Sequence, residues 1–295
     1  MDIDWKIIYD CVGLSISKKL LFSKLDLVNS KEKNILSFID NQKYIRDCNN
    51  NNNVIGIFTT PILSKHFTRT KKAVIECDDP RFVFYSLYNT IAERSYIKTK
   101  TEIDCESSIN KSAQISEFNV KIGKRVVIEA NVVINPDVEI EDDCRICAGS
   151  ILGADGYELK RTSKGIVSVS HDGILHIEKN VFIGCNTIIY KGFSYRHTII
   201  GESTKIDSLV YIAHSVNIGK RCFVVGKSMI CGSATVGNNV WIGPGSVISN
   251  GVIIEDNANI SIGAVVIQNV KSNDKVSGNF AINHLKFIKF IKSIR

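Results

Sequence analysis

Residues 200–266 read IGESTKIDSLVYIAHSVNIGKRCFVVGKSMICGSATVGNNVWIGPGSVISNGVIIEDNANISIGAVV. Every sixth residue of this stretch, starting from Ile200, is isoleucine or valine, twelve times in succession. The residue four positions after each of them is mostly small or β-branched. A helix repeats every 3.6 residues and a strand every two, so neither explains a period of six. The period is typical of a parallel β-helix, in which three units of a short strand and a corner close a triangular coil of about eighteen residues.

The same phase recurs at residues 122–152 and again at residues 177–189. It is interrupted twice, between Leu152 and Ile177 and between Ile189 and Ile200. Extra residues in a solenoid must loop out from one face, and such loops often carry function. The first interruption, GADGYELKRTSKGIVSVSHDGILH, is therefore a candidate substrate loop, with a tolerated surface insertion as the alternative.

The first hundred residues lack the six-residue repeat. Short apolar runs at residues 35–39, 54–58 and 73–75 alternate with polar segments, and the asparagines at 49–53 predict a loop. Residues 81–94 have the apolar spacing of an amphipathic helix. We therefore predict a mainly β protein with a small α/β domain at residues 1–100, a left-handed parallel β-helix at 101–270, and a tail with a basic C-terminal α-helix, HLKFIKFIKSIR, at 271–295.

Charge, cysteine content and the N-terminal residues indicate which binding partners and which cellular compartment to expect. The net charge of +7 is carried by lysines spread along the chain, which favours a solvated surface over a nucleic-acid interface. The nine cysteines are odd in number, scattered and embedded in apolar patterns, which favours the reduced thiols of a cytoplasmic protein. The opening MDIDWKIIYD contains acids and no continuous apolar core, so we expect neither a signal peptide nor a membrane span.

A candidate for general-base chemistry is His214. The repeat predicts a column at one corner of the coils that contains Arg196, His214, Gly232 and Asn250. Because Gly232 has no side chain, its N–H can approach a ligand closely, as an oxyanion donor must. Asp207 precedes His214 by one repeat plus one residue, so both can lie near one edge of a coil, where the carboxylate would fix the imidazole tautomer. A corner histidine at a subunit interface is the alternative interpretation.

The stretch KIDSLVYIAHSVNIGKRCFVVGKSMICGSATVG, residues 205–237, resembles the UDP-3-O-acylglucosamine N-acyltransferases of lipid A biosynthesis. The resemblance implies that His214 is the general base, that Asp207 orients it, and that Gly232 donates to the thioester oxygen. That family associates as trimers with sites between subunits, so the resemblance also implies a homotrimer.

Two further segments extend the resemblance. GADGY, at residues 153–157, is similar to a loop of the family that approaches the sugar, which implies substrate contacts by Asp155, Gly156 and Tyr157.

In the predicted N-terminal domain, SFIDNQKY is similar to a segment whose aromatic and amide side chains hold a uracil base. The resemblance assigns these roles to Phe38, Asn41 and Tyr44. An aromatic face provides affinity for a pyrimidine and an amide provides selectivity for its edge. Without the resemblance, Phe38 and Tyr44 would be assigned to the core.

Departures from the family narrow the prediction. Ser208 and Ser215 stand where the family has asparagine, Val252 stands where it has a second histidine, and the coil region is shorter. We therefore expect a nucleotide-sugar N-acyltransferase that moves an acyl group from acyl-CoA to the amine of a UDP- or dTDP-linked amino sugar, for surface polysaccharide or lipopolysaccharide synthesis. The alternative is the lipid A enzyme itself, which uses acyl carrier protein.

Two other classes remain to be compared. A β-helical carbonic anhydrase needs three converging histidines, and only His197 and His214 have a suitable spacing. The nearby pair Cys144 and Cys147 is isolated, so we expect no metal and no bound cofactor. A non-catalytic β-helix scaffold is the last alternative; the coincidence of base, acid, glycine, loop and aromatic residues in one chain favours an enzyme.

Overall fold

The computed structural model describes residues 3–4, 6–14, 21–194, 196–278 and 281–294. The chain forms two compact units. The N-terminal unit contains Met1–Ile97 and Tyr157–Asp172, and the β-helix unit contains Lys98–Gly156 and Gly173–Arg295. The sequence predicts a boundary at residue 100 and a continuous second domain, whereas the structure assigns a segment of the first interruption to the N-terminal unit.

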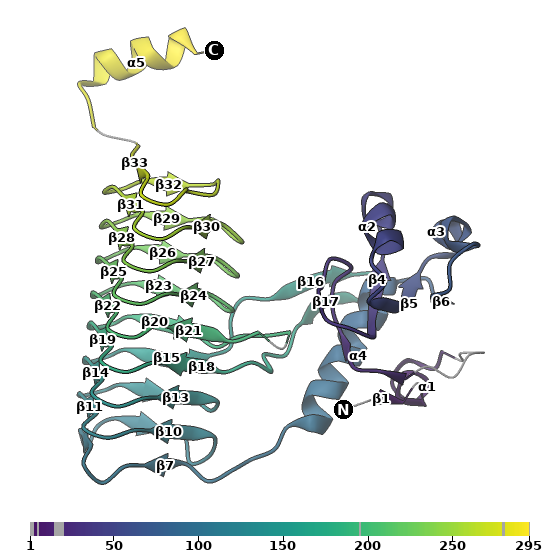
Figure 1. Cartoon of the computed structure of the whole chain (residues 1–295), viewed down its shortest axis with the longest axis horizontal. Helices are drawn as coiled ribbons and strands as arrows, with labels where there is room; N and C mark the ends of the chain where they lie inside the picture. Colours follow the sequence, from purple (N-terminus) through teal and green to yellow (C-terminus); the bar gives the residue numbers. More distant parts are fainter. Residues whose placement is uncertain (1–2, 5, 15–20, 195, 279–280, 295) are drawn as a thin grey trace. The chain divides into compact units, whose positions relative to one another are not determined.

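The β-helix unit consists of stacked coils, each of which contributes one short strand to each of three parallel sheets (Figure 1). The β7 sheet contains β7 (Glu102–Ile103), β10 (Val120–Ile122), β13 (Val138–Ile140), β18 (Leu175–Ile177), β21 (Thr198–Ile200), β24 (Asn217–Ile218), β27 (Thr235–Val236) and β30 (Ile253–Ile254). The β8 sheet contains β8 (Ser108–Ile109), β11 (Val127–Ile128), β14 (Arg145–Ile146), β19 (Phe182–Ile183), β22 (Lys205–Ile206), β25 (Phe223–Val224), β28 (Trp241–Ile242), β31 (Asn259–Ile260) and β33 (Lys275–Val276). The β9 sheet contains β9 (Gln114–Ile115), β12 (Val133–Ile134), β15 (Ile151–Ala154), β20 (Ile188–Tyr190), β23 (Tyr211–Ile212), β26 (Met229–Ile230), β29 (Val247–Ile248) and β32 (Val265–Val266).

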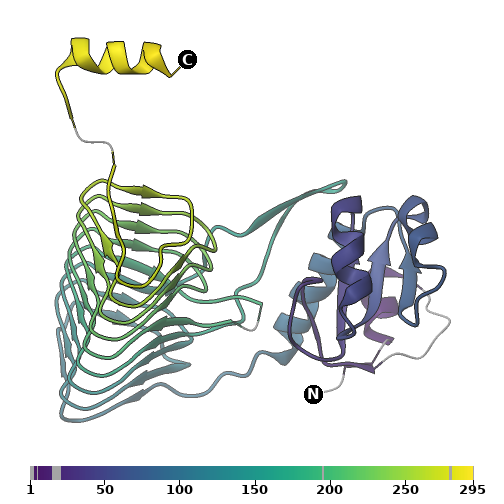
Figure 2. The ribbon, with the colours of Figure 1, turned by 45° about the horizontal axis from the view of Figure 1, so that its top comes forward.

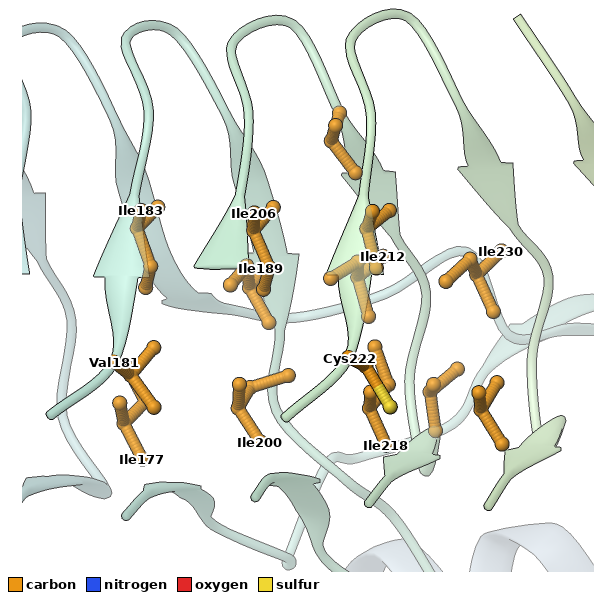
Figure 3. Close-up of a cluster of buried hydrophobic side chains, with 14 of the residues drawn as sticks. Ile177, Val181, Ile183, Ile189, Ile200, Ile206, Ile212, Ile218, Cys222 and Ile230 are labelled. Carbon is orange, nitrogen blue, oxygen red and sulfur yellow. The ribbon is translucent and has the colours of Figure 1, made fainter. Parts of the chain in front are cut away.

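The six-residue repeat fills the inside of this triangle, as the sequence predicts. All twelve isoleucine and valine positions from Ile200 to Val266 are buried, and so are the small residues four positions later. The parallel register aligns like positions of neighbouring coils, for example Ile183 with Ile206, so that the side chains stack into the interior (Figure 3). Burial of one such aliphatic side chain contributes about 1.5–3 kcal/mol. The left-handed parallel β-helix is therefore confirmed.

Each corner of the coil needs a residue with a left-handed backbone. From Ser203 to Gly263 a positive φ recurs at every sixth residue. Even Leu209 adopts it, with φ 61°. This conformation turns the chain from one sheet into the next, and the triangular outline is visible in Figure 2.

Both interruptions of the repeat leave the coils at the same corner. The first lies between β15 and β18 and the second between β20 and β21, in each case after a strand of the β9 sheet and before a strand of the β7 sheet. We call this edge of the triangle the β9/β7 corner, and the edge between the β8 and β9 sheets the β8/β9 corner.

The N-terminal unit is built on a parallel sheet in the order β3-β4-β5-β6. Its elements are β1 (Ile3–Asp4), α1 (Lys6–Val12), β2 (Leu21–Phe22), β3 (Lys24–Leu25), β4 (Ile35–Ile39), η1 (Gln42–Tyr44), α2 (Ile45–Asn50), β5 (Val54–Thr59), α3 (Pro61–Ser64), η2 (Lys65–Phe67), β6 (Ala73–Glu76), α4 (Pro80–Ser95), β16 (Leu159–Thr162) and β17 (Gly165–Ser168). The three apolar runs of the sequence form strands β4, β5 and β6, and the predicted amphipathic helix is α4. The asparagine loop is shorter than predicted because helix α2 continues to Asn50, and the amide of Asn51 still donates to Asp47.

The hairpin β16–β17 interacts with helix α4. The side chain of Asn89 donates to the carbonyl of Ser168 at 2.8 Å and accepts from the amide of Ser170 at 2.9 Å. The hydroxyl of Tyr88 donates to Asp172. These contacts explain why the inserted segment belongs to the N-terminal unit.

The predicted C-terminal helix is α5 (His284–Ser293). It exposes Leu285, Phe287 and Phe290, between which Lys286 and Lys289 lie in the sequence. In the part of the chain that the structure describes, no helix is both long enough and apolar enough to cross a membrane.

Candidate functional site

His214 lies at the β9/β7 corner, two residues after strand β23 ends. The pairing of β23 with β26 and of β26 with β29 aligns Ile212, Ile230 and Ile248, so Gly232 and Asn250 follow in the next two coils at the same corner. This part of the predicted column is confirmed. The imidazole is half-buried.

Gly232 lies against the ring of His214. A Cβ added to Gly232 would be 2.5 Å from Cε1 and 2.7 Å from Nε2 of the imidazole, which is closer than real Cβ atoms approach. Among the described residues the Gly232 amide donates no backbone hydrogen bond. The absence of a side chain therefore brings a backbone N–H and the imidazole together, which is the arrangement needed for a base beside an oxyanion donor.

The second interruption occupies the same corner in the preceding coil. The ring of Phe193 meets the imidazole of His214 edge-on, with centroids 4.8 Å apart and an interplanar angle of 80°. The amide of Phe193 donates to Ser215 Oγ at 3.3 Å. Because extra residues are inserted after β20, several residues precede His214 at this corner, and the exposed Arg196 is only one of them. No pattern in the sequence indicates Phe193, which lies inside the interruption.

A buried ion pair also lies at the β9/β7 corner. Lys191 Nζ is 2.9 Å from Asp137 Oδ2 and 3.4 Å from Asp155 Oδ1. Only 11% of the Lys191 side chain and 12% of the Asp137 side chain are exposed. Burial lowers the pKa of Lys191, but the hydrogen bond and charge of Asp137 outweigh it and hold the pKa above its ordinary value. Lys191 therefore stays charged and ties the candidate substrate loop to the coil.

The GADGY residues separate in the structure. Gly153 has φ +74°, and a Cβ there would be 2.3 Å from Val138 Cγ2, so only glycine fits this position. Asp155 is paired with Lys191, and Gly156 is the last residue of this segment of the β-helix unit. Tyr157 begins the segment of the N-terminal unit and is 81% exposed.

Asp207 lies at a different corner from His214. It follows β22 at the β8/β9 corner and is exposed, whereas His214 follows β23 at the β9/β7 corner of the same coil. The carboxylate accepts the amides of Ser208 at 2.7 Å and Gly226 at 3.1 Å. One chain thus does not bring the carboxylate of Asp207 to the imidazole at a common edge, because seven residues along a coil reach the next corner.

The second candidate region is a cavity of about 390 Å³ within the N-terminal unit. It is lined by Leu27, Val28, Asn29, Phe38, Asp40, Tyr44, Asp47, Arg81, Tyr85 and Lys160. The structure therefore brings Phe38 and Tyr44 to one cavity. Phe38 is half-buried and lies 4.8 Å from the ring of Phe84 and 5.8 Å from that of Tyr85. Asn41 is not among the lining residues; its side chain accepts the amide of Lys43 at 3.0 Å and begins η1.

Charged groups line the same cavity. Arg81 pairs with Asp40 through Nη2 at 2.7 Å and Nε at 2.8 Å. Lys160, from hairpin strand β16, pairs with Glu158 and lies 5.2 Å from the centroid of the Tyr85 ring. Burial raises the pKa of Tyr85, so its hydroxyl stays protonated at neutral pH. The cavity combines aromatic faces with cationic donors, and sequence reasoning missed Lys160 because it lies outside the segment that carries the resemblance.

Among the described residues, no three histidines converge on one point. His176 Nδ1 lies 3.2 Å from Glu139 and Nε2 lies 3.1 Å from Glu141, while His197 Nδ1 accepts the amide of Ile174. Val252, where the family has a second histidine, is buried in the apolar core. These contacts leave the carbonic anhydrase alternative without support.

Comparisons with known proteins identify the family and the fold of the chain. The bacterial transferase hexapeptide family (six repeats) matches residues 119–154 and 233–268. UDP-3-O-acylglucosamine N-acyltransferase 1 of Francisella tularensis subsp. holarctica is 31% identical over 243 residues, which cover 72% of this chain and 70% of that protein. The chain belongs to the UDP-3-O-acylglucosamine N-acyltransferase family. UDP-3-O-acylglucosamine N-acyltransferase of Helicobacter pylori is 40% identical over 113 residues, but the match covers only 38% of this chain and 33% of that protein.

Solved structures of related acyltransferases share the fold. UDP-N-acetylglucosamine O-acyltransferase from Moraxella catarrhalis has a TM-score of 0.51 at 22% identity, covering 66% of this chain and 80% of that chain. UDP-N-acetylglucosamine acyltransferase from Campylobacter jejuni has the same TM-score at 19% identity, covering 65% of this chain and 83% of that chain. At these identities the similarity concerns the β-helix and not the substrate.

Proposed function

We propose that the chain is an N-acyltransferase that moves an acyl group from a thioester to the amine of a nucleotide-linked amino sugar. The observation that carries the proposal is the contact between Gly232 and His214, which leaves room for a base and a backbone donor but for no side chain between them. The family to which the chain belongs supports a UDP-linked glucosamine derivative as the sugar.

In this mechanism His214 accepts the proton that the sugar amine loses as the amine attacks the thioester carbonyl. The Gly232 N–H donates to the oxyanion, and the thiol of the donor leaves as the carbonyl reforms. An amine is already a competent nucleophile, so no covalent intermediate with the protein is needed.

The proposal assigns the nucleoside to the cavity of the N-terminal unit. Phe38 and Tyr44 offer aromatic faces to a pyrimidine, while Arg81 and Lys160 offer donors to the ribose or the phosphates. The resemblance assigns Asn41 to the binding of the pyrimidine base. Asn41 can do so in this cavity only if its side chain gives up the hydrogen bond that it accepts from the amide of Lys43.

The separation of Asp207 from His214 supports an assembly of several copies. Since the two residues occupy different corners of one coil, an aspartate that orients the imidazole has to come from a second copy of the chain. A homotrimer in which the β8/β9 corner of one copy faces the β9/β7 corner of the next supplies that carboxylate at each of three sites.

His214→Ala tests the chemical step. We expect the acyl-transfer rate with UDP-linked amino sugars to fall at least ~100-fold, as for loss of a general base, while calorimetry shows sugar binding nearly unchanged. His197→Ala is the matched control, because this exposed histidine lies in the second interruption at the same corner. Near-normal turnover of His214→Ala would sink the proposal.

A mixing experiment tests the assembly. His214→Ala and Asp207→Ala chains, each inactive by itself, are refolded or expressed together. If the two residues act across a subunit interface, some sites of the mixed trimers have both groups intact and activity returns. Activity no higher than that of the separate variants contradicts the shared site but leaves the role of His214 standing.

The acyl donor separates two forms of the proposal. We expect acyl-CoA to be the better donor, because we propose that the chain is a family member with a shorter coil region that acts in surface polysaccharide synthesis. The lipid A alternative predicts faster turnover with 3-hydroxyacyl carrier protein and a sugar that already bears an acyl chain. Side-by-side rates with the two donors and with UDP- and dTDP-linked amino sugars decide between them.

A further inference from the structure

A second cluster of reactive side chains lies at the β8/β9 corner. Glu129 directly follows β11, Cys147 directly follows β14, and Cys185 lies two residues after β19. These strands are neighbours in the β8 sheet, so the three residues come from three consecutive coils. One carboxylate oxygen and two sulfur atoms lie within 4.8 Å of one another.

This donor set is suited to a borderline-soft divalent cation. Tetrahedral Zn²⁺ binds thiolate sulfur at about 2.3 Å and carboxylate oxygen at about 2.0–2.2 Å, which places ligand atoms about 3.3–3.8 Å apart. Small side-chain rotations bring the three atoms from their present separation to that range. Thiolates discriminate against Mg²⁺ and Ca²⁺, which prefer oxygen ligands.

The backbone around the cluster is held by the coil ladder. The amide of Glu129 donates to Ile146 at 3.0 Å, and that of Cys147 donates to Ile183 at 2.8 Å. The amide of Cys185 donates to Ser208 Oγ at 3.1 Å. The ligand positions are therefore fixed before a cation arrives, and the site needs little ordering on binding.

Neighbouring groups balance the charge of such a site. Arg145 donates to Glu129 Oε1 through Nε at 2.9 Å and Nη2 at 2.6 Å, and the amide of Ala148 donates to Oε2 at 3.1 Å. Hydrogen bonds of this kind orient a ligating carboxylate. Two thiolates and one carboxylate carry three negative charges, which Zn²⁺ and the Arg145 guanidinium neutralise together.

We propose that Glu129, Cys147 and Cys185 form a binding site for Zn²⁺ that fastens three coils of the β-helix together. Thiols bind Zn²⁺ as thiolates, so binding releases two protons, one from each sulfur, and forms two Zn–S bonds and one Zn–O bond. A water molecule completes the tetrahedron at the fourth position, which the three side chains leave open.

The site differs from the metal sites considered from the sequence. Cys144 lies three residues before Cys147, on the other side of β14, and is buried in the apolar core. The partner of Cys147 is instead Cys185, which the first interruption separates from it in the sequence. The cluster shares the β8/β9 corner with Asp207, which the proposed trimer brings to the active site of the next copy. The tests below therefore measure metal content and thermal unfolding, so that their outcome does not depend on acyl transfer.

The test uses the full-length chain, reduced with a phosphine and then dialysed against Zn²⁺ or Co²⁺. We expect one tightly bound metal per chain by elemental analysis, and a sulfur-to-cobalt charge-transfer band with strong four-coordinate absorption in the Co²⁺ form. Cys147→Ser and Cys185→Ser should each lose the band and the tight metal, whereas Glu129→Gln should keep the sulfur band and bind at least tenfold more weakly.

Cys105→Ser is the matched control, because this exposed thiol lies at another corner and should leave metal content unchanged. Zn²⁺ should also raise the midpoint of thermal unfolding of the wild-type chain and of Cys105→Ser, but not of the double variant of Cys147 and Cys185. Metal content equal to that of the double variant overturns the proposal. So does isolation of the chain with a Cys147–Cys185 disulfide, detected by mass spectrometry, that reforms in the presence of Zn²⁺.

Discussion

Substituting Gly232 by alanine tests the contact between this glycine and the imidazole of His214. The new Cβ would lie 2.5 Å from Cε1 and 2.7 Å from Nε2 of His214, whereas carbon atoms in contact are about 3.5–4.0 Å apart. The imidazole must therefore move by about 1 Å. A displacement of that size costs about 100-fold in rate when the displaced group takes part in the reaction, equivalent to about 2.7 kcal/mol of transition-state stabilisation.

The structural cost of Gly232→Ala should be smaller. Overpacking of one methyl group costs about 1–3 kcal/mol, and part of it is relieved because His214 is only half-buried. Urea unfolding should therefore show a folded chain with a modest loss of stability, and the imidazole NMR signals of His214 should shift. Acyl transfer is measured with saturating sugar and donor, so that the loss is assigned to kcat.

Gly278→Ala is the control for this experiment, because a Cβ there meets nothing within 4 Å and the residue has no positive φ. We expect it to retain full activity. Full activity of Gly232→Ala together with unmoved His214 signals would refute the packing argument. Full activity with shifted signals would instead refute the catalytic role of the imidazole.

Three further predictions follow from the packing. Lys191→Met leaves the carboxylate of Asp137 buried and should cost about 3–5 kcal/mol in urea unfolding; a loss below 1 kcal/mol would contradict the ion pair. Ile212→Ala should cost about 2–5 kcal/mol by the same measurement, since the side chain is fully buried, and the exposed Ile253→Ala should cost far less. Asp79→Ala removes the N-cap of α4, which accepts the amide of Phe82 at 2.8 Å, and should cost about 1 kcal/mol at pH 7. Burial raises the pKa of Asp79, but its backbone hydrogen bonds have the larger combined effect and lower the pKa in the folded state. The stability that Asp79 contributes is therefore present above the unfolded-state pKa and is lost as the pH falls through the folded-state pKa. A stability difference between wild type and Asp79→Ala that persists below about pH 2 would contradict this prediction.

The β-helix was predictable because its rule is local. One aliphatic residue per six fills the coil, and each of the positions from Ile200 to Val266 is buried as that rule requires. The N-terminal unit was less predictable. Its strands and helix α4 follow from apolar runs, but the assignment of the hairpin β16–β17 depends on contacts such as that of Asn89 with Ser168, which join distant parts of the sequence.

The candidate site was predicted in part. The stacking of Gly232 on His214 follows from the repeat, since no interruption separates their coils. The predicted proximity of Asp207 to His214 failed within one chain because seven residues, one repeat plus one, extend from one corner of the coil to the next. The cluster of Cys147 and Cys185 was invisible for a related reason: the first interruption pairs Ile146 with Ile183, far from the regular spacing of one coil.

Residues of the candidate site are grouped correctly when they are assigned to the sheet whose strand they follow, rather than by the number of residues between them. The three sheets alternate along the chain, and Leu152, Ile189 and Ile212 occupy aligned positions in strands of the β9 sheet. The segment after each of them must then leave at the same edge of the triangle. Hence Asp155, Lys191 and His214, which lie in sequence segments of unequal length, belong to one corner, and the ion pair between the first two confirms part of this grouping. In a solenoid, residues that follow strands of the same sheet are the ones to compare when a site is sought, however many residues the loops between them contain.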